Sequence, residues 1–323
     1  MSAVISDPVI NKHIDKDAGT DNIFRWGVAS AAAFVMFILL AAALAMLWGG
    51  RLAFETFGWR FFTNTEWDAV GKNFGAAVPI IGTLVSSAIA MVIAVPISFG
   101  IAFYLTEIAP SWLRGPVSAA VELLAGIPSI IYGMWGLFVF VPFMADHILP
   151  WVNDYLGSVP IIGPVFQGPP LGIGMLTAGT VLAIMVIPFI SSIMRDVFRT
   201  VPTSLKESAY ALGATNWEVV WNIVLPYCRS AVVGGIFLGL GRALGETMAV
   251  TFVLGNAHQL SLSILMPGNS IAAAIANEFT EADSDVYLSS LIALGFILFI
   301  VTFVVLAIAR LMLHSMARKE GSS

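Results

Sequence analysis

Two charged residues interrupt a long apolar stretch that covers residues 231–254. Arg242 and Glu246 are the only ionisable side chains in that stretch. Each charge costs about 2.5 to 3.5 kcal/mol at the centre of a bilayer, so neither side chain is expected to face lipid. In a continuous helix, their separation of four residues puts both on one face. The pair is therefore expected to face protein or water inside a membrane.

The chemistry that such a pair offers is recognition of an anion. A guanidinium is permanently charged, and its planar fork suits a tetrahedral oxyanion, so Arg242 is the predicted substrate contact. Glu246 would orient Arg242 in an empty site, or accept a hydrogen bond from a protonated phosphate oxygen. Sulfate offers no such proton near neutral pH. The alternative is an internal ion pair that only locks helices together.

Glycines in the same stretch predict close helix packing around the charged pair. Gly235 and Gly239 continue the face of Arg242 and Glu246. An adjacent stripe contains Gly234, Gly241 and Gly245. Small residues at such spacings let helix backbones approach closely in membranes. The charged pair is therefore expected at a helix interface or a cavity.

The composition is that of a membrane protein. Of 323 residues, 58% are hydrophobic and 11% are charged, against roughly 25% charged residues in a soluble domain. A spanning helix needs about 20 apolar residues, and about six stretches are long enough. They cover residues 26–48, 76–105, 117–144, 171–194, 231–254 and 288–308. The first stretch lacks the features of a cleaved signal peptide and is expected to remain as an anchor.

The distribution of lysine and arginine predicts the orientation, because cytoplasmic loops retain positive charge. The loops at 145–170 and 255–287 contain neither residue type, and are therefore expected outside. With the N-terminus inside, the outer side keeps only Arg51, Arg60 and Lys72. Both termini are then cytoplasmic, because six spans return the chain to the side where it began, and the expected location is a bacterial inner membrane.

Several other functions are excluded by composition. The formal net charge of −5 argues against nucleic-acid binding. Cys228 is the only cysteine, so no internal disulfide can form. The four histidines are scattered without ligand spacing, which predicts no metal site. No catalytic set of residues occurs at workable spacing, so the chain is not expected to be an enzyme.

The loop at 201–226 predicts two short helices. Ser204 with Glu207, and Thr215 with Glu218, have capping-box spacing at the start of a helix. Gly213 predicts the end of the first helix. Lys206 is the only basic residue in these helices, and Glu207 and Glu218 balance its charge. A helix that lies on lipid usually carries several basic residues, so we expect this loop to enter a groove on a partner protein.

The same loop resembles the EAA loop of ABC importer permeases, whose helix docks on a nucleotide-binding subunit. Ser208 departs from the signature, which usually has alanine there. Pro226 is expected to end the second helix. No glycine-rich phosphate loop ending in Lys-Ser or Lys-Thr occurs, so ATP and Mg are expected on a partner ATPase. The resemblance implies that the ATPase-coupling residues are Glu207, Ala209, Gly213, Thr215, Trp217, Ile223, Leu225 and Pro226.

Segments 239–250, 122–136 and 266–270 resemble the PstC family, the permease subunits of phosphate-specific ABC importers. The resemblance implies an all-α polytopic membrane protein with a type I ABC importer permease core at 76–311. Residues 1–25 would form a cytoplasmic polar tail, 26–48 an N-terminal transmembrane anchor, 49–75 a periplasmic segment and 312–323 a cytoplasmic tail. Glu122 either reaches the membrane interface or acts in gating with Arg195 or another base.

The implied partners are a PstA-like permease subunit, two PstB-like ATPase subunits and a PstS-like periplasmic phosphate-binding protein. A PhoU-like regulator and a sensor kinase would convey phosphate status. Phosphate would arrive from the binding protein and cross by alternating access. The alternatives are an ABC importer permease for molybdate or sulfate, an ion-driven secondary transporter, and a signalling scaffold that moves nothing.

Overall fold

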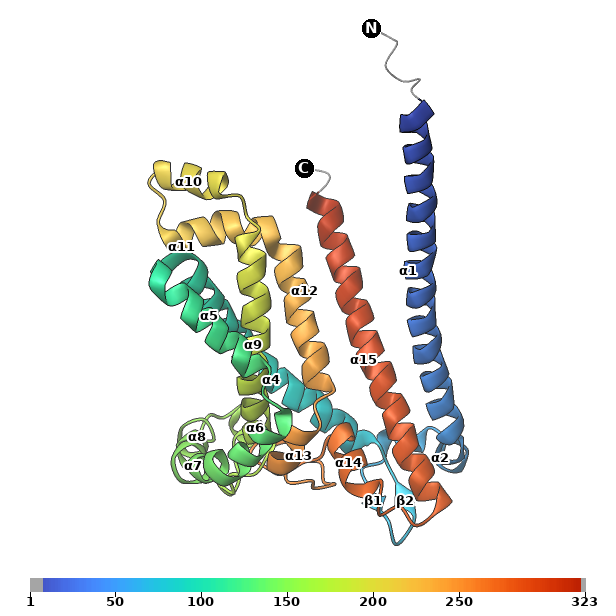
Figure 1. Cartoon of the computed structure of the whole chain (residues 1–323). Coiled ribbons are helices and arrows are strands. Elements are labelled where there is room, and N and C mark those ends of the chain that lie inside the picture. The colour runs from blue at the N-terminus through green and yellow to red at the C-terminus, as the bar shows by residue number, and fades with distance from the viewer. Residues whose placement is uncertain (1–7, 321–323) are drawn as a thin grey trace. The chain divides into compact units, whose positions relative to one another are not determined.

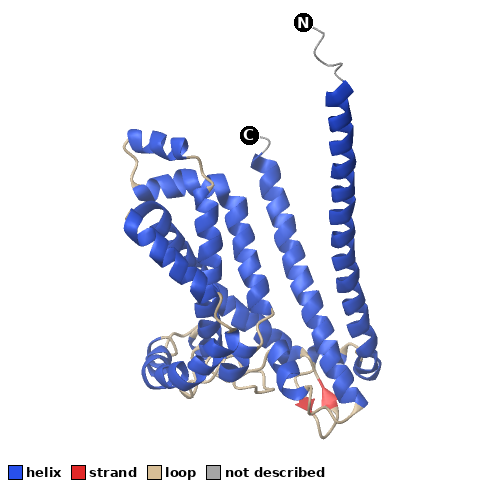
Figure 2. Ribbon diagram, in the orientation of Figure 1, coloured by secondary structure: helices blue, strands red, loops and turns tan. Residues whose placement is uncertain are grey.

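The computed structural model describes the backbone of residues 8–320 and the side chains of residues 21–313 and 315. These residues form two compact units, with the boundary between Gly49 and Gly50. Helices make up most of the chain, and the only strands among the described residues form one short antiparallel hairpin (Figure 2). The all-α membrane architecture expected from the sequence is confirmed.

The first unit is a single long helix, α1 (Pro8–Gly49). Its apolar part, Asp21–Gly49, is long enough to cross a membrane and includes the span predicted at 26–48. Only 6% of its most apolar window is buried, so almost all of this surface is left for lipid or another protein. The polar segment before it, from Pro8 onward, continues the same helix.

The core of the second unit is built around α9 (Met175–Arg199). It packs against α4 (Ala77–Phe103), α5 (Ser111–Ala125), α12 (Leu225–Leu244) and α13 (Met248–Leu254). Of the most apolar window of α9, 61% is buried, far more than in the other candidate spans. This helix therefore lies at the centre of the unit. The last helix, α15 (Asp285–Glu320), packs against α12.

The second unit has two distinct ends (Figure 1). The helices of the 201–226 loop, α10 (Thr203–Ala211) and α11 (Asn216–Val219), lie at the end where α15 finishes. The opposite end carries α13, α14 (Ile271–Glu278) and the hairpin of β1 (Trp67–Asp68) and β2 (Asn73–Phe74). The long helices α9, α12 and α15 run between these ends.

The remaining elements are short. In chain order they are α2 (Arg51–Phe57), α3 (Arg60–Thr63), η1 (Tyr104–Ile108), α6 (Ser129–Trp135), η2 (Gly136–Phe140), α7 (Val141–Phe143), η3 (Met144–Ile148), α8 (Leu149–Tyr155), η4 (Gly163–Val165) and η5 (Val220–Val224). Four of them, η1, η2, η3 and η5, are short π-helical segments, and each continues a neighbouring α-helix.

Within the described residues, six helices are long and apolar enough to cross a membrane. Two of them differ from the prediction. The third covers Ser129–Tyr155 rather than 117–144, because Gly126 and Pro128 separate α5 from α6. Proline cannot donate a backbone hydrogen bond, and it disfavours a helical conformation in the residue before it. The loop predicted at 145–170 is accordingly helical as far as Tyr155.

The fifth span covers Asn216–Leu244 rather than 231–254. It begins within the 201–226 loop, and it ends at a break formed by residues 245–247. The apolar residues that follow the break belong to the separate helix α13. Hydropathy alone joined these two helices because both are apolar, although the backbone between them is not helical.

Candidate functional site

Arg242 lies in the last turn of α12, two residues before this helix ends at Leu244. Its guanidinium carbon lies 5.6 Å from the centre of the Phe189 ring on α9. The side chain is exposed in this chain, and Tyr132 of α6 lies within electrostatic reach of its charge. The guanidinium therefore rests on an aromatic face and keeps its hydrogen-bond donors available to an anion.

Glu246 does not share a helix with Arg242, so the prediction that both lie on one helical face is wrong. Gly245 caps α12, and Glu246 lies in the break before α13. Its Oε1 accepts a hydrogen bond from the backbone N–H of Ala249 at 3.2 Å. A carboxylate in this position satisfies one of the free donors at the start of a helix. No ion pair joins Glu246 to Arg242 in the part of the chain that the structure describes.

The glycines of α12 pack as the sequence predicts. A Cβ atom at Gly239 would lie 2.6 Å from the Ile190 side chain, and one at Gly235 would lie 2.8 Å from Ile193. Both contacts are with α9, so this stripe brings the two helices close together. Gly241 belongs to the second stripe and faces Leu306 of α15.

The first helix of the coupling loop, α10, begins after Pro202 and not at a capping box of Ser204 and Glu207. Both residues lie inside the helix, so that prediction is wrong. Proline disfavours a helical conformation in Val201 before it and lacks a donor itself, which makes it a suitable start. The predicted end is confirmed, because Gly213 has a left-handed φ of 88°. The N–H of Ala214 donates to Ala209 O, and the N–H of Gly213 donates to Tyr210 O, as in a Schellman motif.

The second helix, α11, begins at the predicted capping box of Thr215 and Glu218. The Thr215 N–H donates to Glu218 Oε2 at 2.8 Å, and the Glu218 N–H donates to Thr215 Oγ1 at 3.3 Å. The prediction that Pro226 ends this helix is wrong. A π-helical segment at Val220–Val224 leads into α12, where Pro226 occupies the first turn and its missing N–H is tolerated. Two residues further on, Cys228 departs from helical geometry with a φ of −116°.

The predicted coupling residues form two groups, one exposed to solvent and one packed against this chain. Glu207, Gly213, Thr215, Trp217 and Pro226 are exposed. Ala209 is buried, and Ile223 and Leu225 pack partly against the core of this chain. The first group is therefore available to a partner, while the second group holds the loop in place.

The ion-pair partner of Lys206 lies outside the 201–226 loop, so it is neither Glu207 nor Glu218. The Lys206 ammonium forms an ion pair with Glu107 Oε1 at 2.6 Å, in the π-helical segment that continues α4. Glu107 is 99 residues away in sequence. Sequence patterns could not identify this partner, because nothing local links the two residues.

Glu122 lies on α5 and forms an ion pair with Arg195 of α9. Arg195 Nη2 donates to Glu122 Oε1 at 2.7 Å and to Asp196 Oδ1 at 2.8 Å. The Arg195 side chain is 5% exposed, whereas that of Glu122 is 56% exposed. Arg195 Nη1 is buried without a hydrogen-bond partner. Both earlier interpretations of Glu122 thus retain support, since its carboxylate is exposed and paired with Arg195.

A polar cluster at the opposite end of the unit was not identified from the sequence. Glu278 Oε2 accepts hydrogen bonds from Trp67 Nε1 at 2.5 Å and from the Tyr287 hydroxyl at 2.7 Å. Its Oε1 lies 2.7 Å from His258 Nε2, which also contacts Asn269 Nδ2 at 2.9 Å. Burial raises the pKa of Glu278, but these hydrogen bonds outweigh it and hold that pKa below its ordinary value. The cluster joins the β1–β2 hairpin to α14 and α15.

No grouping of three or more histidine, cysteine, aspartate or glutamate side chains suited to a metal ion occurs among the described residues.

Comparison with known proteins identifies the family. The family model described as "Binding-protein-dependent transport system inner membrane component" matches residues 94–318. The phosphate transport system permease protein PstC of Xylella fastidiosa (strain 9a5c) is 66% identical over 307 residues, which covers 95% of this chain and 94% of that protein. PstC of Pasteurella multocida (strain Pm70) is 54% identical over 312 residues, covering 97% of this chain and 96% of the other.

Among solved structures, a bacterial alginate ABC transporter in complex with a pentasaccharide-bound periplasmic protein has a similar chain. The TM-score is 0.60 at 18% sequence identity, with 91% of this chain and 96% of that chain covered. At this identity the likeness shows the fold alone, which is that of an ABC importer permease. This membrane chain therefore belongs to the PstC family of binding-protein-dependent transport system inner membrane components.

Proposed function

We propose that this chain is a permease subunit of an ATP-driven phosphate importer. The observation that carries the proposal is the identity of 66% with a phosphate transport system permease over 95% of the chain. A second observation supports the substrate class. Arg242 offers an exposed guanidinium, without a carboxylate partner among the described residues, at the break between α12 and α13. A tetrahedral oxyanion suits such a fork of donors.

The proposed assembly contains this chain, a PstA-like permease subunit and two PstB-like ATPase subunits. ATP and Mg would bind to the ATPase subunits, so this chain would need no cofactor and perform no chemical reaction itself. The exposed coupling residues Glu207, Thr215 and Trp217 support docking of α10 and α11 on an ATPase. A PstS-like periplasmic protein would deliver phosphate at the opposite end. A PhoU-like regulator and a sensor kinase would report phosphate status.

The proposed orientation places α10, α11 and the end of α15 in the cytoplasm. The excess of lysine and arginine in the segments assigned to the inside supports it. Both termini are then cytoplasmic, in a bacterial inner membrane. Residues 1–25 serve as a cytoplasmic tail, 26–48 as the anchor, 49–75 as a periplasmic segment, 76–311 as the permease core and 312–323 as the second cytoplasmic tail.

In the proposed mechanism, ATP-driven closure of the ATPase subunits moves α10 and α11, and this motion switches the access of the pathway between the two sides. Arg242 binds the anion on its way through. One carboxylate oxygen of Glu246 stays hydrogen-bonded to the Ala249 N–H at the start of α13, and the other accepts a hydrogen bond from a protonated phosphate oxygen. Glu122 and Arg195 act as a gate, because their ion pair joins α5 to α9.

The test is reconstitution with the candidate partners in vesicles that contain ATP. Entry of labelled phosphate should require both ATP and the external binding protein, and unlabelled molybdate or sulfate should compete poorly. Strong competition by either anion would favour an importer of that oxyanion. Uptake that persists without an ATPase and resists vanadate would indicate an ion-driven transporter, and intact kinase repression with zero uptake would indicate a scaffold.

A further inference from the structure

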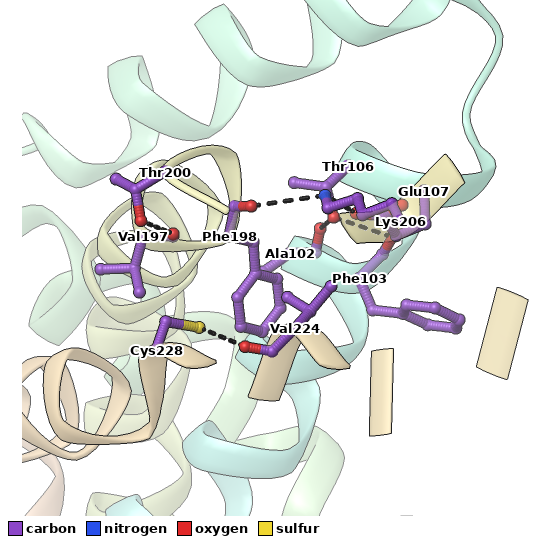
Figure 3. A network of polar contacts seen from close by, with 10 residues as sticks. All are labelled: Ala102, Phe103, Thr106, Glu107, Val197, Phe198, Thr200, Lys206, Val224 and Cys228. Carbon is purple, nitrogen blue, oxygen red and sulfur yellow. Dashed lines mark hydrogen bonds and ion pairs between the residues drawn. The ribbon is translucent and has the colours of Figure 1, made fainter. Parts of the chain in front are cut away.

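One partly buried cation joins three elements at the end of the unit that carries α10. Lys206 of α10 donates from Nζ to Glu107 Oε1 at 2.6 Å and to the backbone carbonyl of Phe198 at 3.4 Å (Figure 3). Glu107 belongs to η1, which continues α4, and Phe198 lies in the last turn of α9. The loop helix is thus tied to the two helices that form the centre of the unit.

Both side chains of this ion pair are largely shielded from solvent. The Lys206 side chain is 15% exposed and that of Glu107 is 6% exposed. A carboxylate this deeply buried needs a partner, because an unpaired buried charge is strongly destabilising. The Phe198 carbonyl is one of the last in its helix and has no helical donor, so a cation there is favourable as well. Lysine suits this position because its ammonium has three donors.

The rest of α10 contributes little to its own attachment. Ala209 is the only buried residue in this helix of nine residues. Its neighbour α11 is attached by Val219, which is buried in the core, and by Trp217, whose ring lies edge-on to Phe103 at 5.7 Å. Trp217 stays 54% exposed, so that contact lies at the surface. Lys206 therefore provides the main buried contact between α10 and the ends of α4 and α9.

We infer that Lys206 and Glu107 are positioning residues that transmit movement of α10 to α4 and α9. The inference rests on the proposed function, in which an ATPase moves α10. A partner that displaces α10 pulls on the end of α4 through the ion pair and on the end of α9 through the Phe198 carbonyl. Without the ion pair, α10 still docks on the ATPase, but its movement is not passed on to α4 and α9.

The experiment measures phosphate entry per ATP hydrolysed in vesicles that contain the complete importer. Four variants are compared with wild type: Lys206→Met, Glu107→Gln, the double variant that combines both, and the charge exchange Lys206→Glu with Glu107→Lys. Arg199→Ala is the control, because it removes an exposed cation next to Phe198. Co-purification of the ATPase subunits shows in each case whether the complex assembles.

Both single variants and the uncharged double variant should lower phosphate entry per ATP at least about fivefold, the lower end of typical coupling between sites. The double variant leaves no buried charge unpaired, so it should assemble as wild type does while its coupling stays low. The charge exchange should restore part of the coupling, and Arg199→Ala should leave it unchanged.

Wild-type coupling in the double variant would overturn the inference, because the pair would then serve stability alone. A charge exchange that couples no better than the single variants would also overturn it, as would single variants that couple like wild type. Failure of the proposed function is distinguishable, because the wild-type importer itself would then show no ATP-dependent phosphate entry.

Discussion

Arg242 lies just before a helix break, and Glu246 lies within it. Arg242 is in the last turn of α12, and Glu246 accepts a hydrogen bond at 3.2 Å from Ala249 in the first turn of α13. The carboxylate is thus used by the backbone, and the guanidinium lies on Phe189 at 5.6 Å. Each residue can therefore be changed without leaving the other as an unpaired half of an ion pair.

Replacement of Arg242 should impair transport strongly. Arg242→Ala removes the proposed anion contact and should reduce phosphate uptake at least about tenfold, equivalent to about 1.4 kcal/mol of lost stabilisation. Arg242→Lys keeps the charge but loses the planar fork and should be intermediate. Uptake by reconstituted vesicles is the measurement, with Arg310→Ala on α15 as an exposed control. Wild-type uptake by a normally expressed Arg242→Ala protein would contradict the assignment.

Glu246→Gln separates the structural role of Glu246 from its proposed role in transport. The amide oxygen can still accept from the Ala249 N–H, so thermal stability should change by less than about 1 kcal/mol. Uptake should nevertheless fall several-fold, because the amide nitrogen that replaces the second carboxylate oxygen cannot accept a hydrogen bond from phosphate. Phosphate carries at least one P–OH group in both its singly and its doubly charged form, so the decrease should persist on either side of neutral pH. An unchanged rate at every pH would exclude a role in substrate binding.

The two carboxylates around Arg195 should substitute for each other. Glu122→Gln or Asp196→Asn alone leaves the guanidinium one exposed partner, so each should cost at most about 1 kcal/mol. The double variant leaves a buried cation unpaired and should cost about 3 kcal/mol. Thermal unfolding in detergent, analysed as a double-mutant cycle, measures this non-additivity. Additive effects would mean that the two carboxylates act independently of Arg195.

Two glycines of α4 should respond in opposite ways to substitution by alanine. A Cβ atom at Gly82 would overlap the backbone carbonyl oxygen of Asn269, whereas one at Gly100 would meet nothing within 4 Å. Gly82→Ala should therefore destabilise the protein by about 1 to 3 kcal/mol through overpacking. Gly100→Ala, the matched control, should be neutral or stabilise by up to about 1 kcal/mol. Thermal unfolding of the two variants compares them directly, and equal melting temperatures would contradict the packing.

The Glu278 cluster should make stability depend on pH on the acid side. Because the folded-state pKa of Glu278 lies below its ordinary value of 4.5, the unfolded state binds a proton first as pH falls. The stabilisation that Glu278 provides is fully present at pH values above its ordinary pKa. It is lost as the pH falls through the lowered pKa of the folded state. Glu278→Gln should lower the free energy of unfolding by about 2 kcal/mol at neutral pH. The melting temperature of this variant should also depend less on pH in the acid range than that of wild type. Glu281→Gln, on an exposed residue, is the control and should leave that pH dependence unchanged.

The sequence by itself determined the class of protein, most of the spans and the local helix signals. Membrane insertion depends on the summed transfer free energy of about 20 neighbouring residues, which is a local property. The capping box of Thr215 and Glu218 and the left-handed Gly213 are local too, since each involves residues only a few positions apart. Spacing within the 201–226 loop was therefore enough to predict a helix, a glycine and a second helix.

Only the tertiary structure decided where the apolar stretches break and which charges meet. The break that follows Arg242 and contains Glu246 lies between two apolar helices, so hydropathy does not mark it. Lys206 pairs with Glu107 across 99 residues, and Arg195 pairs with Glu122 across 73. Such partners are brought together by the packing of α9 against α4 and α5. Packing depends on the complementarity of whole helix surfaces, and no local spacing of charges in the sequence contains that information.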